Sequence, residues 1–206
     1  MLKLHGIRMS NYYSVTKTCL LEKGAEFEEV KSPPSQDEEY LAKSPMGKVP
    51  ALETDSGFIS ETLAIAGYLE ATQPGPALIS EDPFTRAKTI ELVRHLELDI
   101  ELVARRCLPE AFFGATVSDE VKETTEKDLA KGIKAVGRLF VCDPFAMGSQ
   151  FSLADIYTYH CLGLASRIVK KMFNRDLLED LPEVAALMGR LAERDSIKQV
   201  AADQAA

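Results

Sequence analysis

A stretch rich in structure breakers divides this sequence into two parts of different character. It begins with Gln73-Pro74-Gly75-Pro76 and ends with Asp82-Pro83, and prolines and glycines at this density interrupt helices and strands. Before it, short alternating segments and short helical segments take turns; after it, the hydrophobic pattern is that of helices alone. The pattern predicts an α/β domain followed by an all-α domain.

The first part has the predicted order βαβ, then α, then ββα. Its predicted strands cover 2–7, 27–30, 49–53 and 57–59, and its predicted helices cover 15–23, 36–43 and 61–70. Gly24 follows the first helix, where glycine often ends a helix.

The second part shows apolar residues at intervals of three and four over 84–107 and again over 121–141. This spacing predicts two long amphipathic helices. Further helices are expected to begin near Ser152, Pro182 and Ser196. The last six residues, AADQAA, are expected to form a frayed tail.

The composition is that of an ordinary globular protein. The 206 residues are 46% hydrophobic and 27% charged, and the net charge is −8. Because phosphate binding needs a basic face, nucleic acid is not an expected partner. The start of the chain shows no secretory pattern, and no apolar run approaches the roughly 20 residues that span a bilayer. We therefore expect a cytoplasmic protein that does not bind membranes.

Cysteine and histidine spacing gives no sign of metal or disulfide chemistry. The four cysteines form no CxxC pair, and the three histidines are far apart in the sequence. No metal site is therefore expected. The four cysteines are Cys19, Cys107, Cys142 and Cys161, and the three histidines are His5, His95 and His160.

A proline stands at the start of the third predicted strand, in the segment from Ser44 to Leu52. Proline removes a hydrogen bond from a strand ladder. A cis bond between Val49 and Pro50 would turn the Val49 backbone N–H and C=O outward, where the main chain of a ligand could pair with them. An ordinary trans proline at a sheet edge is the alternative that the dipeptide itself leaves open.

Glu61 and Thr62 follow the fourth predicted strand and begin a helix. Their backbone N–H groups belong to the unsatisfied donors of a helix N-terminus, which attract a carboxylate. The Thr62 hydroxyl adds a donor, and the Glu61 carboxylate can accept from an amine on the same ligand. A plain cap with an acid in the first turn is the alternative reading.

These segments resemble the glutathione transferase family. SPMGKVPAL is similar to its N-P-x-G-x-V-P-x-L segment, and Ser60-Glu61-Thr62-Leu63-Ala64-Ile65 resembles its E-S-x-A-I segment. Residues 1–30 look like the first βαβ unit of its serine-type classes. The resemblance implies a thioredoxin-like βαβαββα domain at 1–75 that binds glutathione, a linker at 76–85 and a C-terminal helical bundle at 86–206 that contributes a pocket for a hydrophobic electrophile. It also implies a homodimer and a cis Val49-Pro50 bond.

The resemblance places Ser10 where it would donate a hydrogen bond to the sulfur of glutathione. Free thiols have a pKa near 8.5, and lowering it by roughly two units needs about 3 kcal/mol, which one charge-assisted hydrogen bond and a helix dipole can supply. Asn11, Tyr12, Tyr13 and Ser14 are close enough in sequence to be the donor instead. No cysteine stands at this position, which argues against the redox members of the superfamily.

Further contacts follow from the same resemblance. Lys48 is expected to pair with the glycine carboxylate of glutathione, and Gln36 or Ser35 lies where relatives place other contacts to that group. Ser152 and Asp155 resemble a structural capping box. Candidate walls of the electrophile pocket are Arg105, Arg106, Phe112, Phe113, Met172 and Phe173.

Two functions remain open at this stage. One is an enzyme that adds the glutathione thiolate to an electrophile, either in detoxification or in a dedicated step such as isomerisation or dehalogenation. The other is a non-catalytic binding or scaffold protein on the same fold.

Overall fold

The computed structural model describes residues 1–205. They group into two compact units, one made of residues 1–79 together with those from 193 onward, the other of Ser80–Ala192. The compact helical unit ends at Ala192, and the last helix, which the sequence places in a helical domain at 86–206, groups with residues 1–79. No local pattern predicts this grouping, because it depends on contacts between the last helix and the first helix, which lie far apart in the chain.

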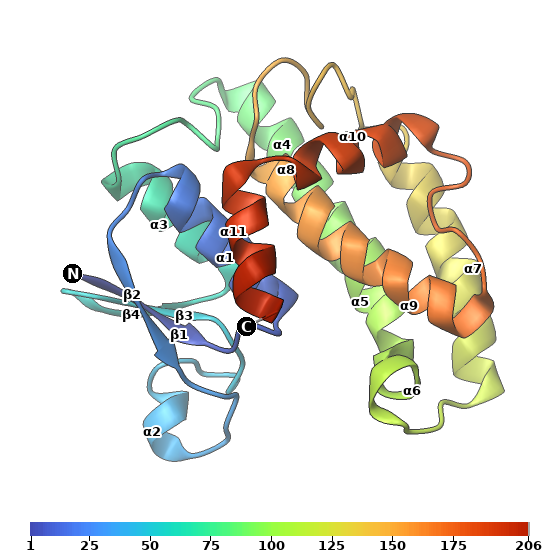
Figure 1. The fold of residues 1–206 in the computed structure, drawn as a ribbon, viewed down its shortest axis with the longest axis horizontal. Helices are drawn as coiled ribbons and strands as arrows, with labels where there is room; N and C mark the ends of the chain where they lie inside the picture. The colour runs from blue at the N-terminus through green and yellow to red at the C-terminus, as the bar shows by residue number, and fades with distance from the viewer. Residues whose placement is uncertain (206) are drawn as a thin grey trace. The chain divides into compact units, whose positions relative to one another are not determined.

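The first unit contains a mixed four-stranded sheet (Figure 1). Its strands are β1 (Leu2–Gly6), β2 (Phe27–Lys31), β3 (Ala51–Thr54) and β4 (Gly57–Ser60), and their order in the sheet is β2-β1-β3-β4. β1 is parallel to β2 and antiparallel to β3, and β3 is antiparallel to β4. The expected α/β domain is confirmed.

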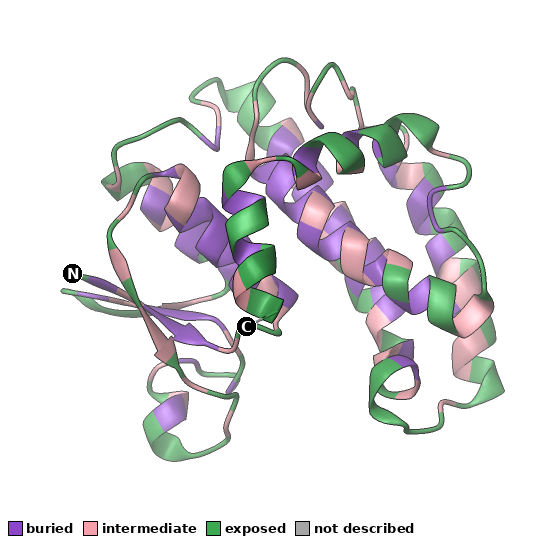
Figure 2. Ribbon diagram, viewed as in Figure 1, coloured by how far each residue is buried: buried purple, intermediate pink, exposed green. Residues whose placement is uncertain are grey.

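Four helices complete this unit: α1 (Asn11–Glu22), α2 (Glu38–Leu41), α3 (Thr62–Thr72) and α11 (Asp195–Ala205). α1 packs against α3 on one side and α11 on another. Figure 2 shows buried positions along most of α1, where Val15 and Leu20 are fully buried together with Leu4 of β1. The helix that carries Ser10 at its start is thus the centre of the unit.

Two helix boundaries differ from expectation. α1 begins at Asn11 rather than at residue 15, because Ser10 caps it and the polar residues of its first turn are buried rather than in a loop. α11 begins at Asp195, so Ser196 is not its cap; the Ser196 hydroxyl donates instead to Glu22 at the end of α1. The expected frayed tail is also wrong up to residue 205, which is helical.

The second unit consists of helices. They are α4 (Pro83–His95), the π-helix η1 (Leu96–Glu101), α5 (Leu102–Ala104), the 3-10 helix η2 (Arg105–Cys107), α6 (Leu108–Phe113), α7 (Asp119–Val136), α8 (Leu153–Tyr157), the π-helix η3 (Thr158–Leu162), α9 (Gly163–Phe173) and α10 (Pro182–Ala192). The long helix expected over 84–107 is a helical run interrupted by π and 3-10 turns. The helix expected over 121–141 ends earlier, at Val136.

The expected capping box at Ser152 is present. Asp155 is fully buried and its carboxylate accepts from the Ser152 backbone N–H at 2.9 Å and from the Ala146 N–H at 2.8 Å. Burial raises the pKa of this carboxyl, against the effect of these hydrogen bonds. These contacts support the structural role that the sequence assigns to Asp155.

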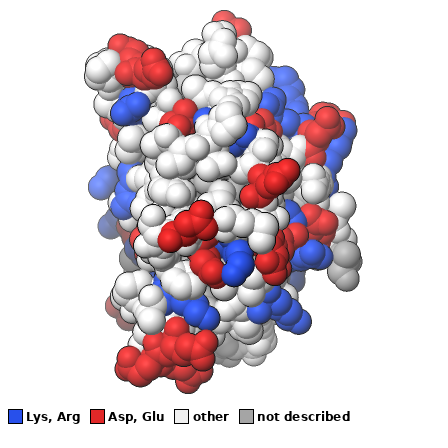
Figure 3. Space-filling model, turned by 90° about the vertical axis from the view of Figure 1, so that its left-hand side faces the viewer, with Lys and Arg blue, Asp and Glu red and all other residues white. Residues whose placement is uncertain are grey.

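The surface has charges of both signs. Figure 3 shows acidic and basic side chains interspersed among uncharged ones on one face of the molecule. Within residues 1–205, no helix has the length and apolar character that crossing a membrane requires.

Candidate glutathione site

The register of the sheet brings three predicted site segments to one end of it. His5 near the end of β1 pairs with Ala51 at the start of β3, and Ala51 pairs with Ser60 at the end of β4. The chain that leaves β1 toward Ser10, the chain that enters β3 through Pro50, and the chain that leaves β4 into α3 therefore meet at this end. Segments that are separated by tens of residues in the sequence become neighbours here.

Ser10 caps α1 at this end of the sheet. Its backbone is extended (φ −76, ψ 125), and its Oγ accepts a hydrogen bond from the Tyr13 N–H at 3.3 Å. A hydroxyl oxygen that accepts this bond still carries a hydrogen that it can donate. Ser10 is partly exposed, so a ligand can reach that hydrogen.

Two of the alternative donors are committed elsewhere. Tyr13 is 3% exposed and donates its hydroxyl to Glu29 at 2.6 Å. Burial and this bond raise the pKa of Tyr13 far above its usual range. Ser14 is fully buried and donates its hydroxyl to the Ser10 carbonyl at 3.1 Å. Of the other two alternatives to Ser10, Asn11 is buried and Tyr12 is half-buried.

The segment before β3 has the backbone that the sequence predicted. The Val49-Pro50 peptide bond is cis. The ladder between β3 and β4 begins at the Ala51 and Ser60 pair, so Val49 lies outside it. A Cβ on Gly6 would stand 3.4 Å from the Val49 Cβ, which places the end of β1 directly beside this turn.

Gln36 lies against the same segment. Its side-chain amide donates to the Met46 carbonyl at 3.3 Å. Gly47 has a φ of +66, and a Cβ there would stand only 2.2 Å from the Ser35 carbonyl oxygen, so this close approach requires glycine. Gln36 therefore lies against the residues that directly precede Lys48, which is exposed.

The N-terminus of α3 differs from that of α1. Glu61 is the residue before the helix, and its φ of 69 is a conformation that non-glycine residues rarely adopt. Within the described chain its side chain makes no capping hydrogen bond. Glu61 is exposed, and Thr62 is 6% exposed. Strained residues of this kind concentrate at binding sites.

The predicted walls of the electrophile pocket are largely engaged with other side chains. Arg105 donates its Nε to the buried carboxylate of Glu101 at 2.9 Å, and Arg106 pairs with Asp128 at 2.7 Å. The Lys171 ammonium lies 4.5 Å from the centre of the Phe112 ring. These contacts support a structural role for both arginines.

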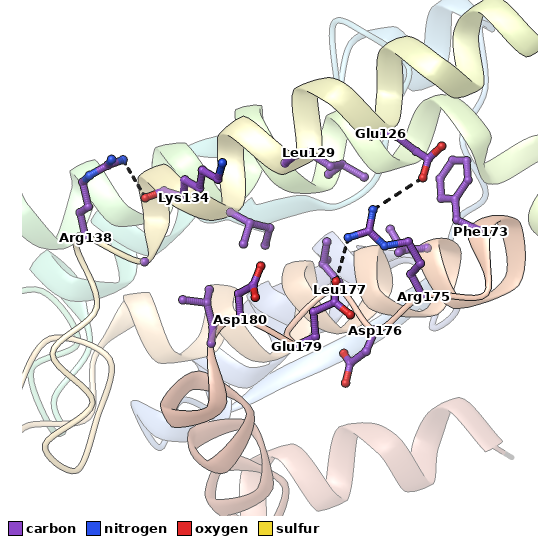
Figure 4. Close-up of a pocket in the computed structure, with 15 residues that line it drawn as sticks. Glu126, Leu129, Lys134, Arg138, Phe173, Arg175, Asp176, Leu177, Glu179 and Asp180 are labelled. Atoms are coloured by element: carbon purple, nitrogen blue, oxygen red, sulfur yellow. Dashed lines mark hydrogen bonds and ion pairs between the residues drawn. The ribbon is translucent and has the colours of Figure 1, made fainter.

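The helical unit contains a pocket of about 490 Å³ between α7 and the segment after α9 (Figure 4). Its apolar lining includes Leu129 and Phe173. Arg175 pairs with Glu126 of α7 at 3.8 Å and with Glu179 on its own segment at 2.8 Å. The residues predicted to contact glutathione, all within the described part of the chain, are not among those that line it.

His160 and Cys19 are buried titratable groups outside the candidate glutathione site, and neither is suited to a catalytic role. Burial lowers the pKa of His160 to about 3, with a smaller effect from Arg167. Cys19 is 1% exposed, and burial raises the pKa of its thiol, so a reactive thiolate there is disfavoured. Residues 1–205 contain no group of three or more His, Cys, Asp or Glu side chains that could hold a metal ion.

The sequence did not predict the charged cluster that Lys17 of α1 forms with Glu29 and Asp203. Lys17 of α1 is 2% exposed, and its ammonium lies 2.7 Å from Glu29 and 2.5 Å from Asp203. The one available signal was a lysine within the apolar stretch VTKTCLLEK, since a buried lysine needs carboxylate partners. Nothing local pointed to Asp203 as one of them.

The strand order and the helical unit that follows define a thioredoxin-like domain joined to an all-helical domain. Two family models match the chain: glutathione S-transferase, N-terminal domain, at residues 4–77, and glutathione S-transferase, C-terminal domain, at residues 110–204. A glutathione S-transferase of Pseudomonas putida is 44% identical over 206 residues, covering 100% of this chain and 94% of the relative. The chain belongs to the glutathione S-transferase family.

More distant relatives agree with this assignment. The glutathione S-transferase GstA of Escherichia coli O157:H7 is 29% identical, covering 78% of this chain and 76% of the relative. The crystal structure of glutathione transferase F7 from Populus trichocarpa superimposes with a TM-score of 0.80 at 22% identity over 99% of both chains. This last likeness confirms the expected fold.

Proposed function

We propose that this chain binds glutathione at the end of the sheet where β1, β3 and α3 meet, and adds its thiolate to an electrophilic small molecule. The observation that carries the proposal is the register of the sheet, which gathers the Ser10 turn, the Val49-Pro50 turn and the start of α3 at one end. Glutathione needs partners for its γ-glutamyl end, for its main chain and for its sulfur. The start of α3, the Val49-Pro50 turn and the Ser10 turn would supply them in that order.

The start of α3 would hold the γ-glutamyl end of glutathione. The ligand carboxylate accepts from the backbone N–H groups at Glu61 and Thr62 and from the Thr62 hydroxyl, where the helix dipole favours negative charge. The ligand amine pairs with the exposed Glu61 carboxylate. The strained backbone of Glu61 (φ 69) supports a binding role.

The middle and the far end of the tripeptide would lie along the Pro50 turn. The backbone N–H and C=O of Val49 pair with the cysteinyl main chain, as an added strand would, while Pro50 holds the turn. Lys48 and Gln36 face the glycine carboxylate, and their proximity through Met46 and Gly47 supports this arrangement.

Ser10 would donate its hydroxyl hydrogen to the sulfur. This bond and the α1 dipole favour the thiolate over the thiol, so the thiol proton leaves to solvent at neutral pH. The thiolate sulfur then forms a bond to an electrophilic carbon: in a substitution the leaving group departs with the electron pair of its bond to that carbon, and in an addition the π pair moves to the neighbouring atom, which takes a proton from solvent. Proximity of the two bound reactants supplies much of the acceleration.

The electrophile would bind against the helical unit. Phe112, Phe113 and Met172 remain candidates for its contacts.

We also propose a cytoplasmic homodimer. Exposed apolar side chains on the run from α4 to α5, Phe84, Leu98 and Leu102, support an interface there. Sedimentation of the full chain tests this interface: a dimer is expected, and Phe84→Ser is expected to weaken it. A monomer at all concentrations would contradict it.

Calorimetric titration with glutathione, together with turnover of a general electrophile, tests the function. We expect binding and turnover by the native chain, and a loss of affinity in Thr62→Val. Thr72→Val, at the exposed end of the same helix, is the matched control and should bind as the native chain does. Binding without turnover would favour the scaffold alternative, and no binding would contradict the site.

A further inference from the structure

The C-terminal helix contacts the Ser10 turn on both of its sides. The side-chain amide of Gln204 donates to the Arg8 carbonyl and to the Ser14 Oγ, each at 2.8 Å. The Ser14 hydroxyl in turn donates to the Ser10 carbonyl at 3.1 Å. One amide group from α11 thus spans the turn that presents Ser10.

The chemistry of the partners fixes which way this amide points. A backbone carbonyl only accepts, so the Gln204 NH₂ group, rather than its oxygen, must face Arg8. The Ser14 hydroxyl hydrogen is used on Ser10, so its oxygen is left to accept from the same NH₂ group. In this series of hydrogen bonds from Gln204 through Ser14 to Ser10, every donor therefore faces an acceptor.

Buried charges hold α11 in place along α1. The Lys17 ammonium, 2% exposed, lies 2.5 Å from the Asp203 carboxylate and 2.7 Å from that of Glu29. At the other end of α11, Arg194 makes two hydrogen bonds to Glu22, at 2.6 and 2.7 Å. The two helices are thus tied at both ends and run antiparallel. Because the Lys17 side chain is buried, losing a carboxylate partner would leave its charge poorly compensated out of water.

We propose that Gln204 is a positioning residue for the Ser10 hydroxyl, held at the turn by the Lys17–Asp203 ion pair. The inference rests on the proposed role of Ser10. Gln204 fixes the backbone before and after Ser10, so the Ser10 oxygen stays in the position where it caps α1 and directs its hydrogen to the ligand sulfur. A turn free to move would donate this bond for only part of the time.

The test is the pKa of the thiol of bound glutathione, followed by the ultraviolet absorbance of its thiolate. Gln204→Met keeps the size of the side chain and removes its donors. We expect the thiol pKa to rise by about half a unit to one unit, as for the loss of one hydrogen bond, so the thiolate fraction at neutral pH, and kcat with it, should fall by about twofold to threefold. Gln199→Met, at an exposed position of the same helix, is the matched control and should leave the thiol pKa unchanged.

A second variant tests the anchor. Asp203→Asn removes one carboxylate from Lys17 but leaves Glu29 as its partner, so the fold is retained. We expect the thiol pKa to rise in this variant as well. A purely structural role for α11 would lower the melting temperature of both variants without moving the thiol pKa, and that result would overturn the inference.

Ser10→Ala separates this inference from the proposed function. If Ser10→Ala raises the thiol pKa and Gln204→Met does not, Gln204 has no positioning role and Ser10 keeps its own. If Ser10→Ala leaves the thiol pKa unchanged, the proposed role of Ser10 fails, and the inference fails with it.

Discussion

The N-termini of α1 and α3 lie at the same end of the sheet, and they differ in how they are capped. α1 is capped by its own serine, whose Oγ accepts from the Tyr13 N–H. α3 follows Glu61, a strained residue whose side chain makes no capping bond within the described chain. A capped end offers a hydroxyl hydrogen, whereas an end without such a cap offers backbone N–H groups.

The difference matches the two parts of glutathione that we assign to them. A thiolate accepts one hydrogen bond well from a hydroxyl, while a carboxylate accepts several from backbone N–H groups at a helix end. The first end is also supported from behind by α11, and its polar first turn is buried. We infer that the α1 end is built for accurate placement of one donor and the α3 end for binding.

The largest expected effect comes from the capped end. Ser10→Ala should lower kcat/KM for the electrophile by about twentyfold at neutral pH and saturating glutathione, because most of the two pKa units are lost with the hydroxyl and the thiolate fraction falls accordingly. The variant should also lose about 1 kcal/mol of unfolding free energy with its cap. Steady-state kinetics and thermal unfolding measure the two effects.

Ser118→Ala is the matched control for this variant. Ser118 caps α7 in the helical unit through the Val121 N–H, so its loss should cost similar stability and no activity. Equal activity in Ser10→Ala and Ser118→Ala would mean that Ser10 only caps α1. The proposed difference between the α1 and α3 ends would then be contradicted.

At the α3 end, Glu61→Gln should weaken glutathione binding by about tenfold or more, since it removes a charge-assisted bond to the ligand amine. Glu61→Gly should weaken binding similarly, yet exceed Glu61→Gln in unfolding free energy by about 1 kcal/mol, because glycine adopts a positive φ without strain. Calorimetry and chemical denaturation separate charge from strain. Unchanged affinity in both variants would remove Glu61 from the site.

A third helix end sharpens the comparison because it has a complete capping box and no proposed ligand. Ser152→Ala should cost about 1 kcal/mol of unfolding free energy and leave glutathione affinity and kcat unchanged. Denaturant unfolding and calorimetry check this. A loss of glutathione affinity in Ser152→Ala would contradict a purely structural role for this capping box.

The smallest effect concerns pH and the support of α1. Burial opposes ionisation of Glu29, but the bonds from Lys17 and Tyr13 outweigh it and lower the pKa of this carboxyl. Its stabilising effect is therefore present above the ordinary value near 4.3 and is lost as the pH falls through the lowered one. Unfolding free energy measured against pH should fall less steeply below that ordinary value in Glu29→Gln.

Glu28→Gln, an exposed neighbour on the same strand, is the control for this pH effect. It should follow the native curve. If Glu29→Gln also follows the native curve, the acid has no part in holding α1.

The sequence predicted the local parts of this molecule well. Strand positions and the start of α3 depend on residues that are close in the chain. The cis bond at Pro50 followed from the resemblance to a known family, because the dipeptide alone leaves a trans bond open. The meeting of these segments depends on the sheet register, which the structure shows and the order of elements along the chain does not specify.

Long-range contacts could not be predicted. The first turn of α1 reads as polar loop because its burial depends on Glu29 and on α11, which lies nearly the whole chain away. Asp203 and Gln204 stand in a short alanine-rich tail, and their contacts join residues 186 to 196 positions apart. No local pattern marks such a pair, so the expectation of a frayed tail was wrong.

The most direct test of the account is a crystal structure of the full chain with glutathione bound. We expect the sulfur within hydrogen-bonding distance of the Ser10 Oγ and the γ-glutamyl carboxylate at the backbone N–H groups that begin α3. A sulfur held by Tyr12 or Asn11, or a carboxylate bound away from Glu61 and Thr62, would contradict it.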